Sequence, residues 1–122
     1  MKTIYYNPVN ENGGCVIRSI SKALNKNYLD VKNELIHINE SYNEEEVFEK
    51  YLFKNNFVID NSYKNKLLKD VNLNGVNIVF AHVNDWYHMM CVIDNIVYDK
   101  ASFEEIKNMK IIKVYKLKRN EN

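Results

Sequence analysis

The chain is poor in residues that break or cross-link a fold. Its 122 residues include one proline, three glycines and two cysteines, and glutamine is absent. Two cysteines allow at most one disulfide, and a reducing compartment favours free thiols. Because no repeat, low-complexity tract or Pro/Gly/Ser linker interrupts the sequence, we expect residues 1–122 to form a single domain.

Long apolar runs and a charge excess are also lacking. No segment approaches the roughly 18 consecutive apolar residues of a membrane span. The opening residues, MKTIYYNP, reach a turn before a secretory apolar stretch develops. The net charge of +1 creates no field that attracts nucleic acid or an anionic membrane. We therefore expect a cytoplasmic protein without nucleic-acid or membrane partners, and the sequence leaves its oligomeric state open.

Apolar periodicity predicts helices in the first half of the chain. One is expected over residues 14–25, a second from a cap at Asn27 or Asp30 to about Asn39, and a third from Asn43. Three polar residues of the first helix are expected to face outward: Arg18, Ser21 and Lys22.

The second half changes to β character. Strands are expected at residues 57–59, 76–83, 88–93, 96–99 and 109–117, with one or two helical turns within 64–71. Helices followed by strands predict an α+β fold, in which N-terminal helices pack on a C-terminal antiparallel sheet.

The segment Asn12-Gly13-Gly14-Cys15-Val16-Ile17 places a cysteine in the first turn of the first predicted helix. The partial positive charge and free N–H groups of a helix N-terminus lower the pKa of a thiol and increase its reactivity. The alternative is that Cys15 simply packs beneath its helix, as most free cysteines do.

A histidine and an aspartate lie on a predicted hairpin formed by residues 88–99. With Asp94-Asn95 as the turn, Ile93 pairs with Ile96, Met90 with Asp99 and His88 with Ala101. Because side chains alternate along a strand, His88 and Asp99 share one face, close enough for the carboxylate to orient the imidazole. Cys91 points to the opposite face and is expected in the core.

Two other histidines compete with His88 for the role of a base. His37 lies inside the second predicted helix and is interpreted as a surface residue. His82 ends a strand and could serve if the register differs, but no following strand returns an aspartate to it.

Two stretches carry a resemblance to a known family. The glycine-led Cys-Val-Ile-Arg-Ser-Ile-Ser-Lys-Ala-Leu and the distal His-Met-Met-Cys-Val-Ile-Asp-Asn-Ile-Val-Tyr-Asp resemble the small papain-like cysteine peptidase domains of bacteria and their phages. The resemblance implies a papain-like fold with Cys15 as nucleophile, His88 as base and Asp99 as the residue that orients His88.

Papain-like sites also use a Gln or Asn upstream of the nucleophile to stabilise the oxyanion. The chain has no glutamine, so the resemblance assigns this role to Asn10, with Asn12 and Asn7 as alternatives. Trp86 and Tyr87 are candidate substrate contacts, or else pack over the hairpin.

The resulting hypothesis is a cysteine hydrolase, whether protease, isopeptidase or amidase, that cleaves a peptide or protein through a thioester without metal or organic cofactor. Gly14, Trp86 and Tyr87 are its expected substrate-binding residues. Metal binding by Cys15, His88 and Cys91 is disfavoured because Cys91 faces away. The alternative is a non-catalytic binding module on the same fold, such as a phage-encoded inhibitor of a host defence protein.

Overall fold

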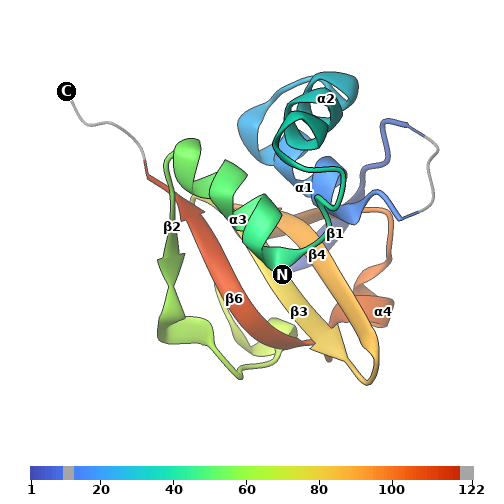
Figure 1. Cartoon of the computed structure of the whole chain (residues 1–122). Coiled ribbons are helices and arrows are strands. Elements are labelled where there is room, and N and C mark those ends of the chain that lie inside the picture. Colours follow the sequence, from blue (N-terminus) through green and yellow to red (C-terminus); the bar gives the residue numbers. More distant parts are fainter. Residues whose placement is uncertain (10–12, 119–122) are drawn as a thin grey trace.

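A computed structural model describes residues 1–9 and 13–118 of the chain (Figure 1). Three helices lie in its first half: α1 (Cys15–Leu24), α2 (Tyr28–Ile38) and α3 (Glu45–Lys54). The strands are β1 (Lys2–Tyr5), β2 (Phe57–Asp60), β3 (Val76–Val83), β4 (Trp86–Ile93), β5 (Ile96–Asp99) and β6 (Lys110–Leu117). The one-turn helix α4 (Phe103–Ile106) follows β5.

The strands form one six-stranded sheet in the order β1-β5-β4-β3-β6-β2. Adjacent strands of this sheet run antiparallel, except that β1 and β5 are parallel. The α+β class is therefore as expected, but the prediction of a purely antiparallel, C-terminal sheet was wrong. A strand from the N-terminus completes one edge and makes the sheet mixed.

Local signals explain where the helices begin and end. The side chain of Asn27 accepts hydrogen bonds from the N–H groups of Leu29 and Asp30 and so caps α2. Asn25 ends α1 in the left-handed conformation, with φ 53°. Glu45 and Glu46 lie in the first turn of α3, where negative charge is favourable.

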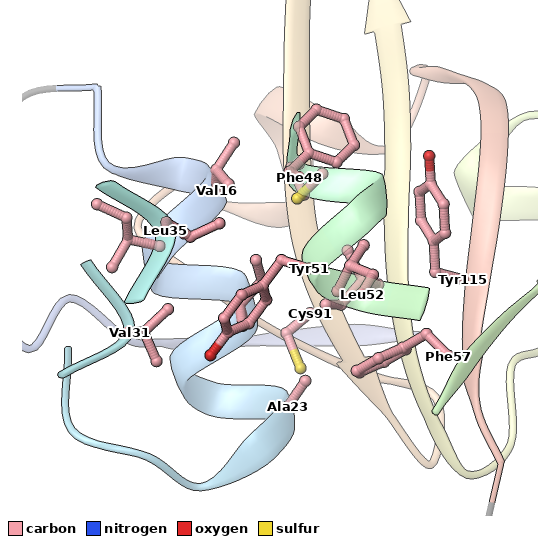
Figure 2. Packing of buried hydrophobic residues seen from close by; sticks show 14 of the residues in the cluster. Val16, Ala23, Val31, Leu35, Phe48, Tyr51, Leu52, Phe57, Cys91 and Tyr115 are labelled. Atoms are coloured by element: carbon pink, nitrogen blue, oxygen red, sulfur yellow. The ribbon is translucent and has the colours of Figure 1, made fainter. Parts of the chain in front are cut away.

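The sheet has a hydrophobic core on each face. On the helical side, α1, α2 and α3 pack against residues such as Met89, Cys91 and Tyr115 (Figure 2). On the other side, Met90 and Val92 pack with the segment around Leu68 and with α4. Cys91 is fully buried, which confirms its expected place in the core.

The expectation that three polar residues of the first helix face outward was wrong for two of them. Arg18 and Ser21 are buried rather than outward, and only Lys22 is partly exposed. The Ser21 hydroxyl donates to the carbonyl of Lys26, which satisfies it inside the protein. The one or two helical turns expected within 64–71 correspond to a single 3₁₀ turn, Leu68–Asp70, and a second 3₁₀ turn, Asn61–Tyr63, precedes this range.

Within the described ranges, no helix combines the length and apolar character needed to cross a bilayer.

Candidate active site

The start of α1 is shaped by two glycines. Gly13 has φ +72°, a conformation that suits glycine. Gly14 caps the helix, and a Cβ built on it would lie 2.3 Å from the buried hydroxyl of Tyr28. Cys15 is the first helical residue, so its backbone N–H belongs to the set that has no partner within the helix. The two glycines thus set the half-buried thiol at the positive end of α1.

The β4–β5 hairpin carries the other two candidate residues. Its turn is Asp94-Asn95, with φ 48° and 65°, and Ile93 pairs with Ile96, as predicted. The ladder ends at the pair Cys91–Tyr98, so the expected Met90–Asp99 and His88–Ala101 pairs are not part of it.

His88 and Asp99 nevertheless meet beyond the end of the ladder. His88 Nε2 lies 2.7 Å from Asp99 Oδ2, and the backbone N–H of Ala101 donates to the same oxygen at 3.3 Å. Asp99 is completely buried and His88 is 7% exposed. The carboxylate therefore fixes the orientation of the imidazole within the protein interior.

Cys15 and His88 line the same two pockets, and hydrogen bonding of the thiol to the His88 side chain and to the Met89 backbone N–H lowers the pKa of Cys15. Because Asp99 uses Nε2, Nδ1 is the ring nitrogen left for the thiol. Burial alone raises the pKa of Cys15, but these two hydrogen bonds and the nearby positive charges of His88 and Arg18 outweigh it. The pKa of the thiol therefore lies below its ordinary value.

His88 shows the complementary shift. Burial lowers its pKa, but hydrogen bonds and negative charge from Asp99 and Cys15 dominate and raise the pKa to about 9. The Trp86 ring lies beside the imidazole in a tilted arrangement, with ring centroids 5.1 Å apart. The contacts therefore favour a thiolate beside an imidazolium.

Arg18 is a member of this cluster that the sequence reading missed. It is 4% exposed, and its Nε lies 3.4 Å from Asp99 Oδ1. A signal was available in the spacing, because residues three apart on a helix share a face and Arg18 is three residues after Cys15.

Two pockets meet at the Cys15–His88 pair. The larger, about 450 Å³, is lined on its far side by polar and small groups that include Arg18, Lys100, Ala101 and Glu105. The smaller, about 250 Å³, is mainly apolar and is lined by Val16, Phe48, Phe80 and Met89. Cys15, His88, Tyr87 and Gly13 line both pockets. The thiol thus lines both a pocket of mixed polar and apolar character and a mainly apolar one.

The predicted substrate contacts have different surroundings. Trp86 and Tyr87 are 40% and 60% exposed and both line the larger pocket, as does Gly14. Tyr87 also stacks on His82, with ring centroids 5.4 Å apart. Both interpretations of these aromatic residues, pocket wall and packing over the hairpin, therefore describe part of their environment.

The oxyanion candidates are placed only in part. Asn10 and Asn12 lie outside the described residues. The amide nitrogen of Asn7 lies 3.5 Å from the Tyr5 hydroxyl, at the end of β1. His37 is exposed on α2, in agreement with its interpretation as a surface residue.

The described part of the chain holds no group of three or more His, Cys, Asp or Glu side chains arranged to bind a metal ion. Comparison with protein-family models, curated proteins and solved structures finds no match for this chain.

Proposed function

We propose that the protein is a cysteine-dependent hydrolase with a papain-like mechanism, acting on an amide bond of a peptide or protein. The proposal rests on one observation, the buried chain of contacts from Cys15 through His88 to Asp99. A nucleophile, a base and a residue that orients the base are the parts required for acyl transfer through a thioester.

In the proposed reaction the Cys15 sulfur attacks the carbonyl carbon of the substrate and forms a tetrahedral oxyanion. His88 donates its proton to the departing amine as the C–N bond breaks, which leaves a thioester on Cys15. Neutral His88 then takes a proton from water, whose oxygen attacks the thioester. The acid product leaves, and the thiolate and imidazolium are restored.

Stabilisation of the oxyanion is assigned to the N-terminus of α1. The Cys15 N–H has no partner within the helix, and the helix dipole favours negative charge at this point. Asn10 remains the proposed second donor, by resemblance to papain-like sites.

The two pockets support an extended substrate that crosses the thiol. An apolar side chain fits the depression lined by Phe48 and Phe80, and a polar part of the substrate fits the opposite one, near Lys100. Trp86 and Tyr87 line the way between solvent and the thiol.

Alkylation by iodoacetamide tests the proposal without knowledge of the substrate. We expect Cys15 to react at pH 6.5 about 10–100-fold faster than an ordinary thiol, which is only about 1% ionised at that pH. Both Cys15→Ser and His88→Ala should abolish this fast reaction. Mass spectrometry of the labelled peptides identifies the modified residue.

Matched controls are available within the chain. Burial raises the pKa of Cys91 to about 12, so Cys91→Ala should label like the wild type. His82→Ala removes a histidine that stacks on Tyr87 without contacting the thiol and should also leave labelling unchanged. If Cys15 of the wild type reacts with the pH dependence of an ordinary thiol, the hydrolase proposal fails. The exposed aromatic pair Trp86–Tyr87 would then favour a binding module.

A further inference from the structure

Arg18 is a buried charge beside the proposed site, and burial of an arginine is costly unless its charge is compensated. Its side chain is 5% exposed, and its Nε faces Asp99 Oδ1 at 3.4 Å. Arg18 lies on α1, one turn after Cys15, whereas Asp99 ends β5. The ion pair therefore links the helix that carries the thiol to the strand that carries the carboxylate.

The two oxygens of Asp99 have separate partners. Oδ2 accepts from His88 and from the Ala101 N–H. Oδ1 is buried, makes no hydrogen bond among the described residues, and has the Arg18 Nε as its charged neighbour. Because the two oxygens are chemically equivalent, Arg18 and His88 together fix the plane of the carboxylate, with one oxygen toward the guanidinium and the other toward the imidazole.

We propose that Arg18 is a positioning residue of the active site, which holds the Asp99 carboxylate in orientation and balances the charge of the Cys15 thiolate. The inference rests on the proposed function, because it describes how the same site is held in its reactive state. The reactive cluster contains two positive groups, Arg18 and His88, and two negative ones, Cys15 and Asp99. Its net charge is zero, and without Arg18 it is −1.

The contribution of Arg18 to the thiol is electrostatic. Its positive charge is one of the causes that hold the pKa of Cys15 below the ordinary value. Removal of a positive charge from a buried cluster disfavours the thiolate, so the pKa of Cys15 should rise. A purely structural ion pair between α1 and β5 would affect stability without moving this titration.

The test is the pH profile of iodoacetamide alkylation in the full-length protein, measured for Arg18→Met and Arg18→Lys. The alkylation rate rises with pH as the thiolate forms, and in Arg18→Met we expect this rise to occur about one pH unit higher than in the wild type. Arg18→Lys restores the charge and should recover most of the shift. Lys113→Met is the matched control, because Lys113 pairs with Glu45 and Glu49 away from the thiol; it should leave the profile unchanged.

A double-mutant comparison tests the route through Asp99. If Arg18 acts partly by orienting this carboxylate, Arg18→Met should slow alkylation less in an Asp99→Asn background than in the wild type. Should Arg18→Met fail to fold, Arg18→Gln replaces it, since the carboxamide can still donate a hydrogen bond to Asp99 but carries no charge.

The outcomes separate this inference from the function on which it rests. A folded Arg18→Met or Arg18→Gln variant with the wild-type pH profile overturns the role of Arg18 while the hydrolase proposal stands. An ordinary thiol profile in the wild type itself overturns the hydrolase proposal first. A shift of equal size in Lys113→Met would show a general effect of charge and also sink the inference.

Discussion

At the scale of single residues, the site depends on a proton that two side chains share. Cys15 and His88 are hydrogen-bonded, and their pKa values move in opposite directions from their ordinary values. In the proposed thiolate–imidazolium pair the proton of the folded protein lies on the imidazole, whereas an unfolded chain near neutral pH keeps it on the thiol. Folding therefore transfers the proton from sulfur to nitrogen without net uptake or release.

This transfer predicts a pH dependence of stability in Cys15→Ala. His88 titrates near 6.5 when unfolded, and hydrogen bonding to Asp99 raises the folded value. The imidazolium then contributes stability that is complete below pH 6.5 and is lost as the pH rises through the folded pKa. In the wild type near neutral pH, the unfolded chain holds one proton on the Cys15 thiol and the folded protein holds one on the His88 imidazole. Both states bind the same number of protons, so this pair adds no pH dependence there. As the pH rises above about 6.5, we expect the free energy of unfolding of Cys15→Ala to fall by about 1 kcal/mol relative to the wild type, over a range that ends below pH 9 because the variant lacks the hydrogen bond and negative charge by which Cys15 raises the pKa of His88.

Urea denaturation at a series of pH values measures this difference. His37 and His82 are present in both proteins, so their titration cancels in the comparison. Parallel stability curves for Cys15→Ala and the wild type would contradict the shared proton.

A second residue prediction concerns the glycine before the nucleophile. In Gly14→Ala the new Cβ meets the buried Tyr28 hydroxyl at 2.3 Å, so we expect a loss of about 1–3 kcal/mol in the free energy of unfolding. The first turn of α1 should shift with it and slow the alkylation of Cys15.

Gly13→Ala is the control for this change. Nothing lies within 4 Å of its Cβ, so only the left-handed backbone, φ +72°, is strained, at a cost of about 1 kcal/mol. Equal losses of stability in both variants would exclude the steric explanation. The two are compared by chemical denaturation and by labelling at one pH.

The sequence indicated three of the four charged or titratable residues of the site, and the reasons are local. Cys15 follows a glycine pair at a helix start, and His88 and Asp99 lie on one hairpin whose turn residues are recognisable. Arg18 was assigned to the surface because charged residues usually are. Its burial depends on Asp99, which is distant in the sequence, and helical periodicity does not encode that contact.

At the scale of elements, the hairpin turn shows how side chains fix a register. Asp94 and Asn95 both adopt positive φ, and their side-chain oxygens accept hydrogen bonds from the N–H groups of Gly75 and Leu73. The backbone N–H groups of the same two residues donate to the carbonyls of Gly75 and Leu73. The turn is therefore tied to the segment that enters β3.

For Asn95→Ala we expect a loss of about 1–2 kcal/mol in the free energy of unfolding, from backbone strain and the lost hydrogen bond. Asn95→Gly relieves the backbone strain but still loses the side-chain hydrogen bond from the Leu73 N–H, so it should destabilise the protein less than Asn95→Ala does. Asn84→Ala is a matched control, because Asn84 has φ 52° in the β3–β4 turn and strain is its main cost. Thermal or urea unfolding that ranks Asn84→Ala as the more damaging change would contradict this account.

The long elements were predictable from the sequence and the short ones were not. The bounds of β3 and β5 match the prediction because these strands are rich in β-branched and aromatic residues and end at turn residues. β1 was missed because four residues with mostly exposed side chains carry little apolar pattern. α4 is one turn long, and its signal, the capping box between Ser102 and Glu105, was present in the sequence but was not used.

At the scale of the whole molecule, the sheet joins the N-terminal strand to the strand that carries Asp99. β1 pairs in parallel with β5, Tyr5 lies opposite Asp99, and the Tyr6 N–H donates to the Asp99 carbonyl at 3.0 Å. Such pairing between distant segments cannot be inferred from local periodicity, which explains why the mixed character of the sheet was not foreseen. The backbone of Asp99 is thus held from the side opposite β4.

Deletion of residues 1–5 tests this support. We expect faster amide hydrogen exchange along β5 and slower alkylation of Cys15 at pH 6.5, because Asp99 loses its outer neighbour. Exchange in β2 and β6, at the other side of the sheet, serves as the internal control and should remain unchanged. A variant with unaltered β5 exchange would show that β1 has no part in holding the site.

The distance in sequence between the thiol and its histidine has a consequence for biosynthesis. Ribosomes make proteins from the N-terminus, so Cys15 emerges while His88 and Asp99 have yet to be translated. Until the β4–β5 hairpin has emerged and docked against α1, the cysteine has no base beside it and reacts like any exposed thiol. The order of translation therefore leaves the cysteine of the nascent polypeptide without its proposed base until the β4–β5 hairpin has been made.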